Sequence, residues 1–296
     1  MHPGLQLLTF VGIFLIILAI GNVIGAAIVT GLYGLNTVMA IMQLNLKAPH
    51  AVTGLWILQI AGTTTPILAA SVFFAVVIIK EPANYIKPGI KFNWVLMLLV
   101  FAIMFISSPL IELLSNLNQK MVLPSFLKWM RDSEDKAQQL TTAMLQMKTI
   151  WDMLFNLLLI GLLTAIAEEF MFRGVIQTIF ARWTKNHHAA IWITAILFSA
   201  FHMEFFGFLP RMVLGVLFGY FVVWSGSIWT AVWAHFINNG TAVVATYLFQ
   251  HKKIGFNPDN QHVFNYMGYL FSVVIVIFLL YVYRTVTLNK QQLQEY

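Results

Sequence analysis

The chain has 296 residues, of which 59% are hydrophobic and only 9% are charged, and its mean hydropathy is +0.80. A soluble domain carries about 25% charged residues, so this chain cannot cover a water-facing surface of ordinary size. The composition therefore excludes an intrinsically disordered protein, a disulfide scaffold and a soluble nucleic-acid-binding protein. It predicts an all-α polytopic membrane protein.

The charge and the cysteine content exclude further partners and types of site. The net charge of +6 comes from basic residues spread over many short loops, which is typical of interfacial anchors rather than of a nucleic-acid partner. The chain has no cysteine, which excludes disulfides, a thiolate nucleophile and thiolate metal ligands. Any metal in this protein would need His, Asp or Glu ligands.

Charge-free intervals predict the membrane spans, because a span needs about 20 apolar residues. About eight transmembrane helices are expected, with seven or nine as alternatives. The expected spans cover roughly residues 5–33, 48–79, 94–114, 151–180, 189–206, 212–224, 228–249 and 263–283. An even number places both termini on one side, and a slight excess of Lys and Arg in the loops of that side favours the cytoplasm.

Three features stand out in the first half of the chain. Gly21 and Gly25 form a small-xxx-small pair that predicts close helix packing. Pro66 follows three threonines inside the second span and predicts a kink there. Residues 116–148 are the most polar stretch, and their apolar residues recur at helical spacing. This stretch is either an amphipathic helix on the membrane surface or an ordinary solvated connecting helix.

One cluster of charges lies within an otherwise apolar helix. Glu169 and Arg173 are four residues apart, so they share a face and can pair, whereas Glu168 lies about 100° around the helix. A buried structural salt bridge would explain Glu169 and Arg173 but would leave Glu168 unpaired. We therefore predict that Glu168 faces a polar cavity and acts as a general base.

Two histidines and an asparagine on later helices complete the candidate site. His202 lies in the fifth span, and His235 and Asn239 share one face of the seventh. Together with Glu168 these groups could activate a water molecule and stabilise an oxyanion. Glu168, His202 and His235 would equally suit a catalytic zinc ion, and spacing alone leaves both alternatives open. Charged residues near span ends, such as Glu204 and Arg211, are expected to be structural.

The three segments resemble the motifs EExxxR, FxxxH and HxxxN of the CPBP intramembrane protease family, which contains the type II CAAX prenyl endopeptidases. In this chain they are Glu168-Glu169-Phe-Met-Phe-Arg173, Phe198-Ser-Ala-Phe-His202 and His235-Phe-Ile-Asn-Asn239. Their order, spacing and placement in three hydrophobic helices all agree with the family. The resemblance covers about residues 151–249.

The resemblance implies an intramembrane endopeptidase that hydrolyses a peptide bond of a membrane-associated peptide or protein. Glu168 corresponds to the family's water-activating base, with Glu169 and Arg173 beside it. His202, His235 and Asn239 correspond to groups that position the water and stabilise the oxyanion. Both a zinc-dependent and a metal-independent, glutamate-driven mechanism are argued for the family.

Alternative functions are a non-catalytic membrane protein of the bacteriocin-immunity or scaffolding type, and a transporter. No convincing internal repeat supports a transporter, and the HExxH, GxGD and GxSG motifs of other membrane proteases are absent.

We expect three parts in the chain: an N-terminal membrane region (1–150), a catalytic membrane core (151–249), and a final helix with its tail (250–296). The compact chain favours an integral protein of the bacterial cytoplasmic (inner) membrane, with the lipid bilayer as its surroundings. The sequence indicates no oligomeric state.

Overall fold

A computed structural model describes residues 1–87, 94–258 and 263–292, and the regular structure of these residues is entirely helical. The predicted all-α class is therefore confirmed. The N-terminal elements are α1 (Pro3–Tyr33), α2 (Leu35–Met42), α3 (Ala51–Gln59), η1 (Ile60–Thr64), α4 (Thr65–Phe73), η2 (Phe74–Ile78) and α5 (Pro82–Tyr85). The middle elements are α6 (Trp94–Ile106), α7 (Ser108–Gln119), η3 (Ser125–Leu127) and α8 (Lys128–Met144). The remaining elements are α9 (Ile150–Asn156), η4 (Leu157–Leu163), α10 (Thr164–Glu169), η5 (Phe170–Ile176), α11 (Gln177–Thr184), α12 (His187–Phe201), α13 (Phe208–Ser225), α14 (Ile228–Gln250) and α15 (Tyr266–Gln292).

Five helical segments of the described chain are long and apolar enough to cross a membrane. They are Pro3–Tyr33, Ala51–Ile78, Ile150–Thr184, Phe208–Ser225 and Tyr266–Leu288. A sixth span results if α6 and α7, which are bent by 42° where they meet, are taken together. The expected count of eight is thus not confirmed. α12 is a shorter apolar helix, and α14 carries polar residues in its middle that lower its hydropathy.

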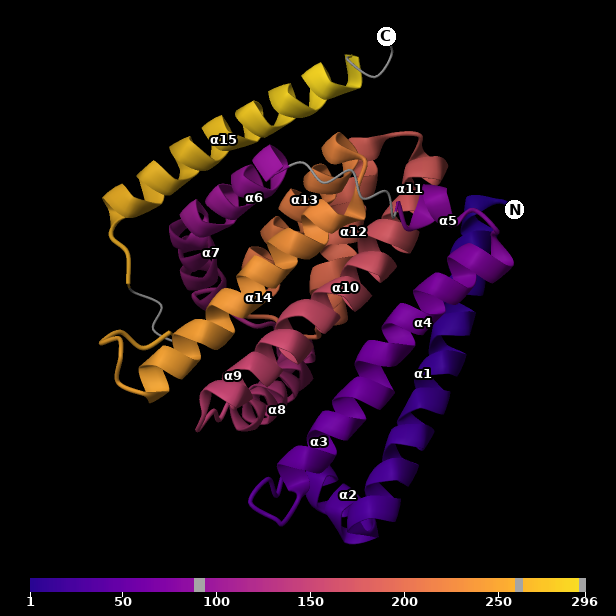
Figure 1. The fold of residues 1–296 in the computed structure, drawn as a ribbon, viewed down its shortest axis with the longest axis vertical. Coiled ribbons are helices and arrows are strands. Elements are labelled where there is room, and N and C mark those ends of the chain that lie inside the picture. The colour runs from indigo at the N-terminus through magenta and orange to yellow at the C-terminus, as the bar shows by residue number, and fades with distance from the viewer. Residues whose placement is uncertain (88–93, 259–262, 293–296) are drawn as a thin grey trace.

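The helices form three groups, which are visible in Figure 1. α1 packs along the rod formed by α3, η1 and α4, and this hairpin extends beyond the other helices. The segments α9 to α14 form the central group. α15 lies against α6 and α7 on the other side, and α6 also contacts α14.

Two apolar clusters hold the three groups together. The first joins the N-terminal hairpin to the central group, with Phe10 and Phe74 packed among residues such as Met171 and Phe172. The second joins α6, α13, α14 and α15. The packing therefore crosses the expected boundary at residue 150.

Two of the long rods contain π-helical turns. η1 and η2 interrupt the rod that contains α3 and α4, and η4 and η5 lie on either side of α10. The predicted kink before Pro66 therefore takes the form of a π turn, η1, in a rod that still qualifies as one span. Single π turns within α-helices are frequent at functional sites.

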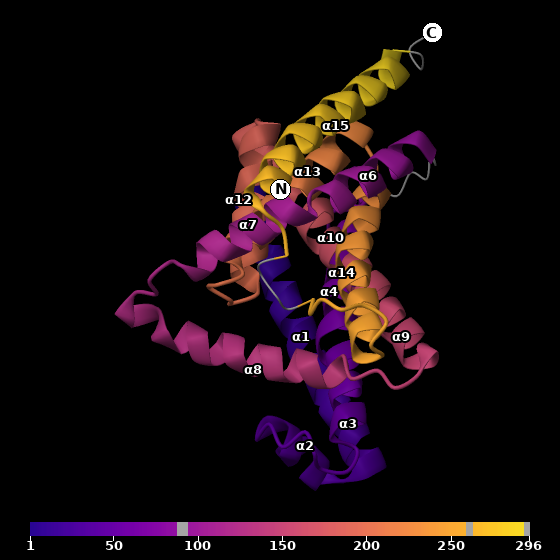
Figure 2. The same ribbon diagram turned by 90° about the vertical axis from the view of Figure 1, so that its left-hand side faces the viewer.

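The polar stretch before residue 148 forms α8, which crosses the other helices in Figure 2. Its apolar residues Leu140 and Met144 pack against a small cluster that includes Ile41 and Leu55. The periodicity therefore identified the helix correctly, and the structure shows that Leu140 and Met144 near its C-terminal end lie against the protein.

Candidate active site

Glu168 and Glu169 are the last two residues of α10, between the π turns η4 and η5. Both carboxylates belong to a helix that the apolar clusters enclose. Because neighbouring residues of a helix point about 100° apart, the two side chains enter different surroundings. Glu169 faces the protein interior, and Glu168 faces a pocket.

Glu169 forms a fully buried ion pair. Arg173 Nη1 donates to Glu169 Oε1 at 3.0 Å, and neither side chain is exposed. Arg173 Nη2 donates to the carbonyl oxygen of Gly215 at 3.1 Å, and the guanidinium carbon lies 4.4 Å from the centre of the Phe198 ring. The pair expected from the spacing of four residues is therefore present in the structure.

His235 joins this buried pair to the pocket. Its Nδ1 lies 2.8 Å from Glu169 Oε1. Because a carboxylate only accepts hydrogen bonds, Nδ1–H is the donor and the orientation of the ring is set by Glu169. His235 Nε2 is left facing Glu168 Oε2 at 3.9 Å.

His202 is oriented in a similar way by the backbone. Its Nδ1 lies 2.9 Å from the carbonyl oxygen of Phe198, so Nδ1–H donates there. Its Nε2 also lies 3.9 Å from Glu168 Oε2. Two imidazole rings with fixed Nδ1 donors thus direct their Nε2 atoms at one carboxylate oxygen.

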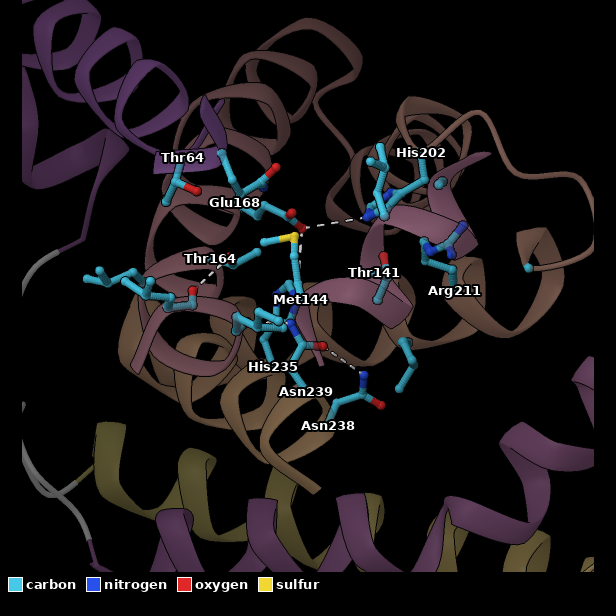
Figure 3. A pocket seen from close by; sticks show the side chains of 18 of the residues that line it. Thr64, Thr141, Met144, Thr164, Glu168, His202, Arg211, His235, Asn238 and Asn239 are labelled. Carbon is cyan, nitrogen blue, oxygen red and sulfur yellow. Dashed lines mark hydrogen bonds and ion pairs between the residues drawn. The ribbon is translucent and has the colours of Figure 1, made fainter. Parts of the chain in front are cut away.

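Glu168 Oε2 is a buried oxygen with no hydrogen-bond partner among the described residues. A separation of 3.9 Å is too long for a direct hydrogen bond. It is of the order that a bridging water molecule spans. Figure 3 shows Glu168 between His202 and His235, with dashed lines to both rings.

These side chains line a pocket of about 570 Å³. α8 contributes Thr141 and Met144 to its wall. Residues of η4 and α10, among them Leu163 and Thr164, lie along another part. The pocket that Glu168 faces is therefore lined both by the central helices and by elements outside them.

Asn239 lines the same pocket, but both ends of its amide group are engaged. Its Nδ2 donates to the carbonyl oxygen of Ile160 at 3.1 Å, and its Oδ1 accepts from Asn238 Nδ2 at 3.1 Å. The bond to Ile160 ties α14 to η4. The structure thus brings all six predicted residues into one connected arrangement, with Asn239 at its edge.

Sequence reasoning missed several polar residues of the pocket, which are Gln59, Thr64, Thr141, Thr164, Arg211 and Asn238. Arg211 was expected to be structural because it lies near a span end. It does bond Glu204, and it also lines the pocket. Asn238 follows His235 by three residues, and this helical spacing was the available signal.

The side chains do not form a metal site in this arrangement. Among the described residues, no group of three or more His, Asp or Glu side chains is placed to hold a metal ion. A zinc ion would need nitrogen and oxygen ligands about 2.0–2.2 Å away. The described donors, as they are placed, do not meet that requirement.

Comparison with known proteins finds a family match in the part of the chain that contains the candidate site. Residues 150–241 match the sequence model of a family described as type II CAAX prenyl endopeptidase, Rce1-like. The predicted resemblance is confirmed for this segment. All six predicted site residues lie within it.

One curated protein is similar in sequence to this chain over 86 residues, a stretch about as long as the family match. The uncharacterized protein YpbD of Bacillus subtilis (strain 168) is 30% identical over 86 residues, which is 28% of this chain and 41% of the relative. The chain thus matches less than half of the length of that relative. No solved structure gives a significant match. The family match supports a function of the CAAX-protease type in a lipid bilayer.

Proposed function

We propose that this protein is an intramembrane endopeptidase in which Glu168 activates the attacking water molecule. The observation that carries the proposal is that the unpartnered oxygen Glu168 Oε2 faces Nε2 of both His202 and His235 within the pocket. A general base has to lie within hydrogen-bond reach of the proton it removes, directly or through one water. A water between these three groups satisfies that condition.

In the proposed reaction the water gives one proton to the Glu168 carboxylate, and its oxygen attacks the carbonyl carbon of the scissile peptide bond. The carbonyl oxygen becomes an oxyanion, which the imidazole rings of His202 and His235 stabilise from the wall of the pocket. Glu168 then gives its proton to the leaving amine as the C–N bond breaks. Glu169 holds the ring of His235 in place through Nδ1, which is the orienting role of a buried carboxylate beside a histidine.

We assign Asn239 a positioning role. Its amide is bonded to Ile160 and Asn238, so it holds α14 against η4 and keeps His235 at the pocket. The substrate is a membrane-associated peptide or protein, and we place the enzyme in the cytoplasmic membrane of a bacterium, where the Bacillus relative offers support.

The test uses the purified full chain in liposomes with a fluorogenic peptide that ends in a farnesylated CAAX sequence, and with the same peptide unmodified. We expect cleavage by the wild type, and a rate about 10²–10⁴-fold lower for Glu168→Gln. In water labelled with oxygen-18, the new carboxyl group should carry one labelled oxygen. Glu81→Gln, which makes the same chemical change outside the pocket, serves as the matched control.

A Glu168→Gln protein with the wild-type rate would overturn the proposed mechanism. A folded wild type that cleaves neither peptide would overturn the CAAX-type activity and favour a non-catalytic membrane protein or a transporter.

A further inference from the structure

The pocket has a wall that no family motif describes. Part of it comes from the N-terminal hairpin, which contributes Gln59 of α3 and Thr64 of η1. Both residues lie outside the matched segment 150–241. We propose that Gln59 and Thr64 bind the main chain of the peptide substrate in the pocket that Glu168 faces. This inference rests on the proposed peptidase function.

Gln59 and Thr64 are polar residues within a membrane span. Ala51–Ile78 contains no charged residue, and a polar side chain at membrane depth faces a partner or a water-filled cavity. No described residue offers a hydrogen bond to the Gln59 amide or the Thr64 hydroxyl, and both line the pocket. Figure 3 shows the Thr64 side chain in the same pocket as Glu168. Their polar groups are therefore available to a ligand there.

η1 is held in a defined register by α1. Pro66 has no backbone N–H, so the carbonyl oxygen of Gly62 loses the donor that an α-helix would supply. Asn22 of α1 replaces it, since its Nδ2 donates to Gly62 O at 2.9 Å and to Leu18 O at 2.8 Å. The N–H of Thr65 meanwhile bonds the carbonyl of Ile60, which closes the π turn.

Gly21 permits this close approach of α1 to η1. A Cβ atom at Gly21 would overlap the carbonyl oxygen of Ala61 and the ring of Pro66. The small-residue pair predicted from the sequence thus packs directly against the turn that carries Thr64. Because α1 fixes η1 from behind, the orientation of Thr64 toward the pocket is built into the fold.

The chemistry of Gln59 and Thr64 determines which ligand groups this wall can bind. A glutamine amide has both a donor and an acceptor, and so does a threonine hydroxyl, which matches the N–H and C=O groups of a peptide. The neighbours from the same rod that line the pocket are the apolar Leu55, Trp56 and Ile60. The wall therefore suits an uncharged main chain whose adjacent side chain is apolar.

The experiment compares Thr64→Val and Gln59→Leu with Thr63→Val. Thr63 belongs to the same π turn but does not line the pocket, so its variant is the matched control. The farnesylated fluorogenic peptide is the probe. Its KM and kcat are measured with each variant, and its Kd is measured by fluorescence anisotropy with each variant combined with Glu168→Gln.

We expect Thr64→Val and Gln59→Leu each to raise KM and Kd about 3- to 10-fold, the effect of one lost neutral hydrogen bond. The kcat and the melting temperature should change little, and Thr63→Val should match the wild type. Thr64→Ser, which keeps the hydroxyl, should retain binding. That rescue would distinguish a lost contact from a folding defect.

Unchanged KM and Kd in folded Thr64→Val and Gln59→Leu proteins would overturn the inference, whatever the cleavage rate. A wild type that binds the peptide without cleaving it would instead overturn the proposed function, while the Kd values would still decide the inference. An absence of saturable binding in the Glu168→Gln background would overturn the inference as well.

Discussion

Two walls of the pocket both present polar groups to it, but different kinds of contact hold these groups in place. The ionisable wall consists of Glu168, His202 and His235, and the uncharged wall consists of Gln59 and Thr64. Each presents polar groups to the pocket, and each is held from behind by polar contacts. Behind the ionisable wall these contacts are an ion pair and two further hydrogen bonds, which involve Glu169 and Arg173. Behind the uncharged wall they are the hydrogen bonds of one asparagine.

This difference indicates where the fold depends most on single residues. A charge left without its partner in a dry interior costs several kcal/mol, because neither water nor another group solvates it. A neutral carbonyl left without its donor costs less. Exposed ion pairs cost least of all, since water replaces the lost partner. We therefore expect the effects of single substitutions to follow that order.

The largest effect on stability is expected for Arg173→Ala. It leaves the Glu169 carboxylate buried without its cation, so we expect a loss of roughly 3–5 kcal/mol in the free energy of unfolding. Denaturant or thermal unfolding in detergent micelles measures it. Glu168→Gln is the comparison, and it should unfold close to the wild type. Equal stability of the two variants would mean that the pair does not form in the native protein.

An intermediate effect is expected for Asn22→Leu, which keeps the bulk of the side chain and removes the donor to Gly62 O. We expect a loss of about 1–3 kcal/mol in stability together with a raised KM, because η1 is no longer fixed. Thr30→Val, another polar residue of α1, should leave both unchanged. A stable Asn22→Leu protein with unaltered KM would show that the uncharged wall needs no support from α1.

The smallest effect is expected at the pair of Glu81 and Arg182, away from both walls. Arg182 Nη2 donates to Glu81 Oε2 at 2.6 Å, and the two side chains are 34% and 41% exposed. This hydrogen bond, and then the one from Asn84, lowers the pKa of Glu81 below its ordinary value. The stabilisation is therefore complete above that ordinary value and is lost as pH falls through the lowered one.

For Glu81→Gln we accordingly expect a drop in melting temperature at pH 7 that is smaller than that of Asn22→Leu, and no difference from the wild type in strong acid. Melting curves of both proteins across this pH range measure it. A difference between the two melting temperatures that grows as the pH falls would contradict a lowered pKa at Glu81.

Much of the central group could be predicted from the sequence. Charge-free intervals located the helices, because burying a charge at membrane depth is expensive. The spacing of Glu169 and Arg173 predicted their pairing, since residues four apart share a helix face. The same reasoning left Glu168 unpaired, and the structure places it on the pocket.

The rest depends on contacts between distant segments, which hydropathy does not encode. Thr64 lies in the π turn η1, and Glu168 lies in α10 between the π turns η4 and η5, and hydropathy predicts none of these turns. α8 showed helical periodicity, but nothing in its pattern indicated that Thr141 would reach the pocket. The span count failed in part at α14, where His235 and its polar neighbours make the helix less apolar.

The most direct test of the different roles of Glu168 and Glu169 compares two variants, Glu168→Gln and Glu169→Gln. The melting temperature and the cleavage rate of each are measured side by side in the same liposomes. The two substitutions make the same chemical change at adjacent residues. We predict that Glu168→Gln keeps the wild-type melting temperature and loses cleavage, whereas Glu169→Gln lowers the melting temperature because Arg173 is left unpaired. Wild-type cleavage by Glu168→Gln, or an unchanged melting temperature for Glu169→Gln, would contradict the division of roles between the two carboxylates.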